Sequence, residues 1–253
     1  METASTSTGR LLAFRIVGWF LGVLTIGYSV YFTVDSILSS DFTTQSHRFH
    51  NLGGFAGGGL IGVFAIMFVL RPAWTAVWYA LVAQAFAWLF GGLMGGDFVS
   101  GLLFVAPLGV VVLAVLHPDP RSLHRLPGRP SVALLTYALL GTIPAWIYAV
   151  INAELQRGPA TDPHVEFHHW SGVAVSALCI AGAALATSLR GAGWQVTGAV
   201  TAVAAVLFGV AGLVFADYPG APSEVGWSWL AIAAGIGFWI LVQVESAREA
   251  TSA

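Results

Sequence analysis

The sequence predicts an all-α integral membrane protein with about eight transmembrane helices, arranged as two four-helix repeats. Three observations predict this fold class. Hydrophobic residues make up 57% of the chain and charged residues 9%, whereas soluble domains average about 25% charged residues. The apolar residues form continuous runs close to the roughly 20 residues that a helix needs to cross a bilayer. Residues of the first half also recur at near-constant spacing in the second half.

Eight apolar runs account for the expected spans. Their continuous hydrophobicity favours helices over barrel strands, which would alternate, and a helix satisfies its backbone hydrogen bonds where water is absent. The first run continues through Tyr28–Phe32 without a small-residue cleavage site, so we interpret it as a span and not as a signal peptide. The expected spans are residues 11–34, 51–70, 74–95, 98–116, 132–153, 170–189, 193–216 and 227–244.

The basic residues predict the orientation of these spans. The chain has ten arginines and no lysine, a composition typical of a GC-rich genome, and the lack of lysine excludes a retinal Schiff base. With a cytoplasmic amino terminus, only Arg48 and Arg157 fall outside, and this asymmetry usually sets orientation. An even number of spans then places both termini in the cytoplasm. We therefore expect a multi-pass protein of a prokaryotic plasma membrane.

An internal repeat divides the chain near its middle. Residues 117–130 are rich in proline and arginine and read as a cytoplasmic linker. The predicted units are thus a first membrane repeat (1–116), the linker (117–130) and a second membrane repeat (131–253). Four spans per unit keep the repeats in one orientation, so their pseudo-twofold axis should follow the membrane normal. The matches 118 residues apart include Phe49 with Phe167, His50 with His168, and Gly54 with Gly172.

Five of the seven histidines lie in two short segments, at the outer mouths of the second and sixth spans. Within each segment two histidines are three or four residues apart, a spacing at which two imidazoles on one helix can bind one metal ion. His50 also caps a helix face formed by Gly54, Gly58 and Gly62, and such small-residue faces pack closely in membranes. We expect His50 and His168 to approach each other there. The candidate metal ligands are His47, His50, His164, His168, His169, Glu166, Asp97 and Asp217, with the acids as ligands or as partners that orient the rings.

Three interpretations of these histidines stay open: metal or haem binding, structural hydrogen bonding at the membrane interface, and proton handling. We expect an extracytoplasmic site for zinc, copper, iron or haem, with His50 and His168 as the haem ligands. If the site is catalytic, the metal would activate water or dioxygen toward a lipid-like substrate. The alternatives are a permease for a small solute and an accessory subunit that packs against partner membrane helices. The chain has no Walker loop or dinucleotide fingerprint, and we expect no nucleic-acid partner.

Overall fold

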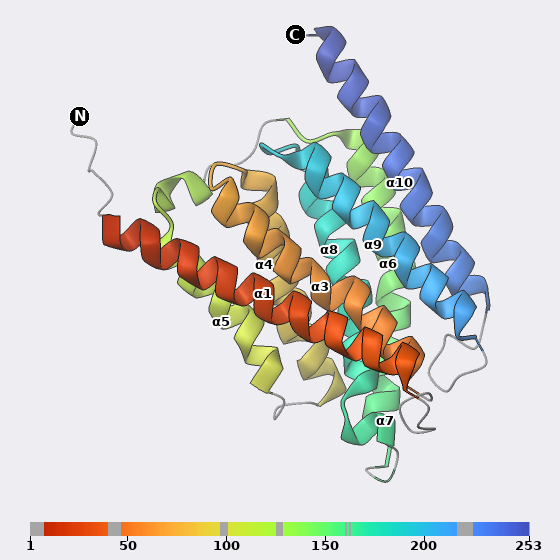
Figure 1. The fold of residues 1–253 in the computed structure, drawn as a ribbon. Coiled ribbons are helices and arrows are strands. Elements are labelled where there is room, and N and C mark those ends of the chain that lie inside the picture. The colour runs from red at the N-terminus through yellow and green to blue at the C-terminus, as the bar shows by residue number, and fades with distance from the viewer. Residues whose placement is uncertain are drawn as a thin grey trace.

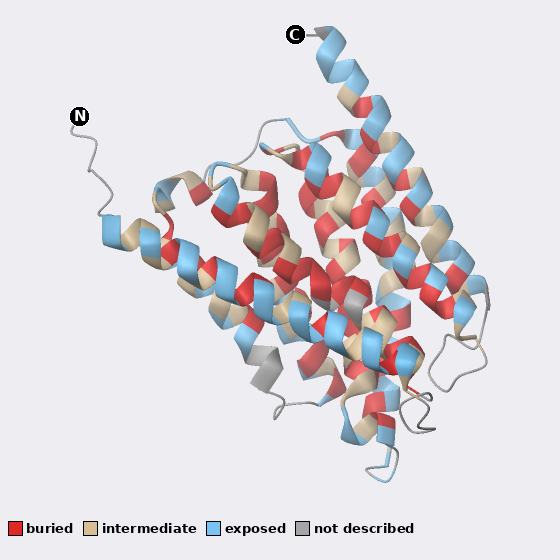
Figure 2. Cartoon of the chain, in the orientation of Figure 1, coloured by how far each residue is buried: buried red, intermediate tan, exposed pale blue. Residues whose placement is uncertain are grey.

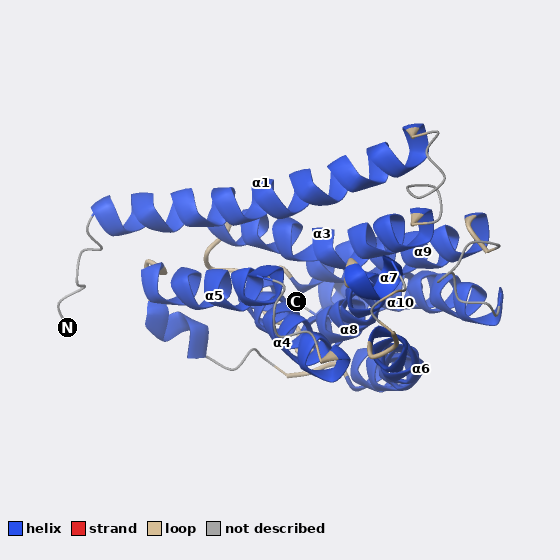
Figure 3. Cartoon of the chain, turned by 90° about the horizontal axis from the view of Figure 1, so that it is seen from below, coloured by secondary structure: helices blue, strands red, loops and turns tan. Residues whose placement is uncertain are grey.

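The computed structural model describes residues 8–39, 47–96, 101–124, 129–159, 161, 163–216 and 225–252. These residues form helices joined by short turns, with no strand among them (Figure 3). The α-helices are α1 (Thr8–Leu38), α3 (Arg48–Leu70), α4 (Thr75–Gly95), α5 (Gly101–Leu116), α6 (Val132–Gln156), α7 (Pro163–Glu166), α8 (His169–Ser188), α9 (Trp194–Val214) and α10 (Val225–Ser252), and a 3-10 helix, η1, covers Pro120–His124.

The predicted all-helical, multi-pass class is confirmed at this level. In the described part of the chain, seven helices are long and apolar enough to cross a membrane, and α5 adds a shorter apolar stretch at Val105–Leu116. α3 and α8 are the most buried of the long helices, while α1, α6 and α10 expose most of their apolar surface (Figure 2). That exposed surface is what helices facing lipid require, because hydrocarbon takes the place of water around them.

The helices pack as two groups around the α3–α8 contact. We call α1, α3, α4 and α5 the first helix group, and α6, α8, α9 and α10 the second helix group. In the first, α1 lies along α3 and also contacts α5; in the second, α6 lies along α8 and also contacts α10. Across the groups, α4 packs on α8 and α9 packs on α3 (Figure 1). α3 and α8 therefore form the centre of the bundle.

Small residues set how closely the central helices approach. A Cβ added at Gly57 of α3 would overlap the backbone of Ser176 in α8, so the two helices are in backbone contact there. Gly62 meets α1 at Gly22 in a similar way. Gly54, which the sequence places on the packed face, would bring an added Cβ within 4 Å of no neighbouring element. The α3–α8 contact thus uses the helix face beside the predicted one.

The two ends of the bundle differ in composition. α7 and the first turns of α3 and α8 lie at one end, and these carry the five clustered histidines. The described start of α1 and the end of α10 both lie at the opposite end, together with η1 (Figure 1). Both ends of the described chain are therefore on the same side of the bundle, away from the histidines.

Candidate functional site

The first histidine segment is held by the end of α1. His47 precedes α3 and His50 belongs to its first turn. Next to them, Arg48 Nε donates a hydrogen bond to the Ser36 carbonyl oxygen at 2.8 Å, and the Asn51 amide donates to the Ser36 hydroxyl. These contacts join the last turn of α1 to the first turn of α3, so the backbone that carries both imidazoles is fixed on two sides.

The second histidine segment is held by the end of α6. Gln156 Nε2 donates to the Val165 carbonyl oxygen at 2.8 Å, and Gln156 Oε1 accepts from the Ser171 backbone N–H at 3.1 Å. One buried amide side chain therefore connects α7 to the start of α8. Between the two helices, His168 adopts a left-handed backbone conformation with φ of 58°, which is uncommon for a residue with a side chain. That turn interrupts the helix and changes which of the following side chains face α3.

Four imidazole rings meet at this end of the bundle, and we call His47, His50, His164 and His169 the histidine cluster. Around the cluster, the ring centroids of His47 and His164 are 4.7 Å apart, those of His164 and His50 5.0 Å, those of His50 and His169 5.3 Å, and those of His169 and His47 4.4 Å. The His164–His169 diagonal is 6.1 Å. The rings thus form a quadrilateral in which the two segments alternate.

The cluster is closed off by aromatic side chains. The ring of Trp170 lies edge-on to His50 at 4.9 Å and also contacts His164 at 5.3 Å. Phe49 contacts His50 from within its own helix at 5.6 Å. His47, His50 and His164 are buried, with exposures of 5%, 4% and 7%. Burial of several imidazoles side by side is costly unless each polar nitrogen is paired, so the pairing of each ring matters.

His50 has a defined tautomer. Its Nδ1 lies 3.3 Å from the His169 carbonyl oxygen, and since a carbonyl only accepts, the proton of that contact belongs to Nδ1. In the neutral ring the lone pair is then on Nε2. That atom is buried and has no hydrogen-bond partner within the described residues. A ring that donates one N–H to a backbone carbonyl and turns its other nitrogen inward has the arrangement of a metal-ligating histidine.

The remaining predicted ligands are not part of the cluster. His168 was predicted to approach His50, but it lies in the turn before α8. The rings that contact His50 are those of His164 and His169. Glu166 is exposed on α7. Asp97 and Asp217 lie outside the described residues. With the rings as they stand, no three His, Cys, Asp or Glu side chains of the described chain are arranged to hold a metal ion.

Two residues outside the predicted ligand set support the cluster. Gln156 positions the α7–α8 turn, and Trp170 covers two of the rings. Trp170 follows His169 directly in the sequence, so an aromatic wall could be suspected from adjacency. Nothing in the local sequence marks Gln156, because its partners are backbone groups in a separate segment.

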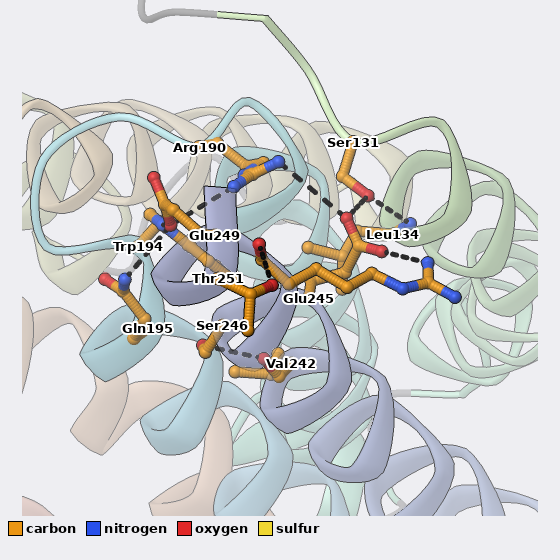
Figure 4. A network of polar contacts seen from close by, with 11 residues as sticks. Ser131, Leu134, Arg190, Trp194, Gln195, Val242, Glu245, Ser246, Glu249 and Thr251 are labelled. Carbon is orange, nitrogen blue, oxygen red and sulfur yellow. Dashed lines mark hydrogen bonds and ion pairs between the residues drawn. The ribbon is translucent and has the colours of Figure 1, made fainter. Parts of the chain in front are cut away.

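A second polar cluster lies at the opposite end of the bundle (Figure 4). The Ser131 hydroxyl donates to Glu245 at 2.8 Å, and Arg248 pairs with the same carboxylate at 2.8 Å. Arg190 reaches Glu245 at 3.8 Å and Glu249 at 3.1 Å. This network ties the start of α6 and the α8–α9 turn to α10. Its charges pair with each other, so it is a structural clamp and offers no unsatisfied group for a ligand.

Comparison with known proteins adds no family assignment. No protein-family model, no curated protein and no solved structure matches this chain. The functional argument therefore depends on the residues and the geometry described above.

Proposed function

We propose that this chain is a multi-pass membrane protein that binds a transition-metal ion through the histidine cluster. The observation that carries the proposal is the His50 imidazole, whose buried Nε2 has no hydrogen-bond partner in the described chain and points away from a fixed Nδ1 donor. The ring centroids of His164 and His169 lie 5.0 and 5.3 Å from that of His50. The ring of His47 contacts both of these rings, at 4.7 and 4.4 Å. A metal ion would give the His50 Nε2 a partner and could draw further ligands from these neighbouring rings.

The ring spacing suits one ion. Imidazoles bound at about 2.0–2.1 Å place their centroids about 4.5 Å apart at right angles and about 5.2 Å apart at the tetrahedral angle. The four sides of the quadrilateral, 4.4 to 5.3 Å, span this interval. Binding requires the side chains to rotate, because their nitrogens do not converge as they stand. Rotation about side-chain bonds is a small change compared with moving helices.

The imidazole nitrogens of the cluster limit which metal ions it can bind. Imidazole nitrogen suits zinc, copper, iron and nickel, and a planar arrangement of nitrogens favours Cu²⁺ or Ni²⁺ over Zn²⁺. Among these ions Cu²⁺ binds nitrogen ligands most tightly, so it is the ion we expect at the cluster. Haem fits less well. A macrocycle needs a flat slot between two ligating rings, and the ring of His50 is in direct contact with His164, His169 and Trp170.

Metal analysis of the purified chain tests the proposal. The full chain, with an affinity tag that contains no histidine, is purified in mild detergent, loaded with Cu²⁺ or Zn²⁺, dialysed and measured by elemental analysis and optical spectroscopy. We expect one Cu²⁺ per chain, and His50→Ala should lower its affinity by at least tenfold, as loss of one of few ligands does.

His124→Ala is the matched control, because His124 is an exposed histidine of η1 at the other end of the bundle. Equal losses in the two variants would mean that the metal binds surface histidines, and the proposal would be abandoned. A Soret band in the untreated protein would instead support haem.

Topology is a separate part of the proposal. We propose two four-helix repeats in a prokaryotic plasma membrane, with both termini cytoplasmic. The matching contacts of α1 with α3 and of α6 with α8 support the repeats, and the location of Arg71, Arg121 and Arg190 away from the histidines supports the orientation. Reporters fused after residue 248 and near residue 129 should read cytoplasmic, and one near residue 159 should read external. A cytoplasmic signal near residue 159 would reverse the orientation.

A further inference from the structure

The second helix group encloses a cavity of about 120 Å³ that none of the histidines lines. Residues of α6, α8, α9 and α10 line it. Along α6 it extends from Tyr137 to Tyr148, which is about 16 Å at 1.5 Å per residue. Each end is closed by a pair of aromatic rings: Tyr137 with Phe238, and Tyr148 with Trp227, both 6.1 Å apart. The cavity is therefore long and narrow.

The cavity exists because the facing side chains are small. Ala138, Gly141, Ala181, Ala205 and Ala234 all line it, one or two from each helix. α6 packs along α8 and has few contacts with α10, so no long side chain fills the space between them. The side chains that line a space of this size lack protein dispersion contacts on one side.

Among the hydroxyls that line this apolar space, those of Tyr137 and Thr201 donate to backbone carbonyl oxygens, and that of Tyr148 is the exception. Tyr148 is 5% exposed, and its hydroxyl is buried without a hydrogen-bond partner in the described residues. The Asn152 side chain is close enough to influence the hydroxyl, but its amide N–H donates to the Tyr148 backbone carbonyl at 2.9 Å and not to the hydroxyl oxygen. A buried hydroxyl needs a partner. An oxygen on a ligand inside the cavity would supply one.

The shape and the opening select the occupant. The cavity is not sealed from the outer surface: Leu230 of α10 lines it and is exposed, and Leu140 and Ile147 of α6 and Trp229 of α10 are exposed as well. The opening therefore faces the same hydrocarbon as the rest of the outer surface. A transmembrane helix, about 10 Å wide with its side chains, is too thick to enter. A volume near that of an engineered cavity that holds benzene admits a short segment of a single hydrocarbon chain, whose remainder would stay in the bilayer.

We propose that this cavity binds one hydrocarbon chain of a lipid-like molecule that enters from the bilayer and accepts a hydrogen bond from Tyr148 through a hydroxyl or carbonyl oxygen. The lining carries no charged residue, so the bound part of the molecule is neutral. The chain would lie along α6, with its oxygen at the Tyr148 end.

The site is linked to the histidine cluster but does not depend on it. Phe208 lines the cavity and contacts both Tyr148 at 5.6 Å and Phe49 at 6.1 Å. Phe49 in turn contacts His50. A molecule bound in the cavity would thus have its polar end two aromatic rings away from the cluster. Binding in the cavity requires no metal, so the two proposals can fail separately.

Photolabelling tests this inference. The full chain in detergent micelles is incubated with a sixteen-carbon alcohol that carries a photoreactive diazirine at mid-chain, irradiated, digested and mapped by mass spectrometry. We expect saturable labelling, at most one per chain, on cavity residues of α6 and α10. Ala205→Leu, which fills the cavity, should reduce that labelling at least fivefold. Tyr148→Phe should raise the half-saturating concentration of the alcohol about fivefold, as loss of one hydrogen bond does.

Two controls make the outcome decisive. Ala233→Leu adds the same atoms to an exposed position of α10 and should leave the labelling unchanged. A diazirine-bearing alkane of the same length, which lacks the oxygen, should bind the parent chain and Tyr148→Phe equally. Labelling that does not saturate, or that Ala205→Leu does not reduce, would overturn the cavity site, and equal binding of the alcohol to the parent and Tyr148→Phe would overturn the role of the hydroxyl. Melting temperature and bound Cu²⁺ are measured on every variant, so misfolding or loss of the metal site is recognised independently.

Discussion

The two helix groups share a packing order but differ in how their interiors are filled. In the first group, Phe14 of α1 packs on Phe68 of α3, and both rings contact His117 beyond α5, at 5.4 and 5.0 Å. Leu21 and Leu113 occupy neighbouring interior positions and are also fully or nearly fully buried. In the second group, the space between α6, α8 and α10 is lined by alanine and glycine and stays open. Similar helix packing thus yields a solid core or a cavity, according to side-chain volume alone.

Truncating one large ring in each group should give the largest difference in stability between the two groups. Phe68→Ala removes a ring that is packed on all sides and should lower the free energy of unfolding by about 3–5 kcal/mol. Phe208→Ala should cost less, because that ring borders the cavity and already lacks contacts on one side. Denaturation of both variants in the same detergent measures the difference. Equal losses would mean that the cavity is filled by protein in solution.

Enlarging one small residue in each group should give a smaller and opposite contrast. Ala65 is fully buried in the packed core of α3, so Ala65→Leu should destabilise the fold by about 1–3 kcal/mol through overpacking. Ala205→Leu adds the same atoms next to the cavity and should be neutral or stabilise by up to about 2 kcal/mol. Thermal unfolding of the two variants side by side checks this, and a larger loss for Ala205→Leu would contradict the hollow interior.

The ends of the two groups should differ in their response to salt. The second group is fastened by Glu245 with Arg190 and Arg248, whereas the first is fastened by rings around His117. Glu245→Gln should cost about 1 kcal/mol, since Arg248 is well exposed and its pairing is screened. The loss should shrink in high salt. The cost of Phe68→Ala should stay constant when both are measured in low and high salt.

Much of the fold could be predicted because hydrophobic length is a local property of the sequence. The predicted run 51–70 corresponds to Arg48–Leu70, and 132–153 to Val132–Gln156. The fourth span is shorter than predicted. The run 98–116 corresponds to α5, which has 16 residues, and its described apolar stretch begins at Val105. Composition reveals that a segment is apolar, but the length of the helix depends on the turn before it.

The pairing of the histidines could be predicted only in part. The sequence placed both segments at the same end, because each precedes a span of the same direction. It did not reveal which rings meet, since extending α8 backward as one helix would align His164 with His168. The left-handed turn at His168 ends that continuity and brings His169 to the cluster. The pairing therefore follows a single backbone conformation, and the hydrogen bonds of Gln156 hold the chain on both sides of it. The cavity likewise depends on the spacing between helices that are distant in sequence.

The backbone contact between Gly57 and Ser176 gives the bundle a pivot. Helices that touch this closely have no room to approach further, but they can still rock about the point of contact. His50 lies two turns from Gly57, roughly 10 Å along the axis, so a rocking motion of about 5° would shift its backbone by roughly 1 Å. On the other arm, His169 lies a similar distance from Ser176 and would move in the opposite sense. The gap between His50 and His169 is therefore set by the angle at which α3 and α8 cross at Gly57 and Ser176, so a small change in that angle would change the gap.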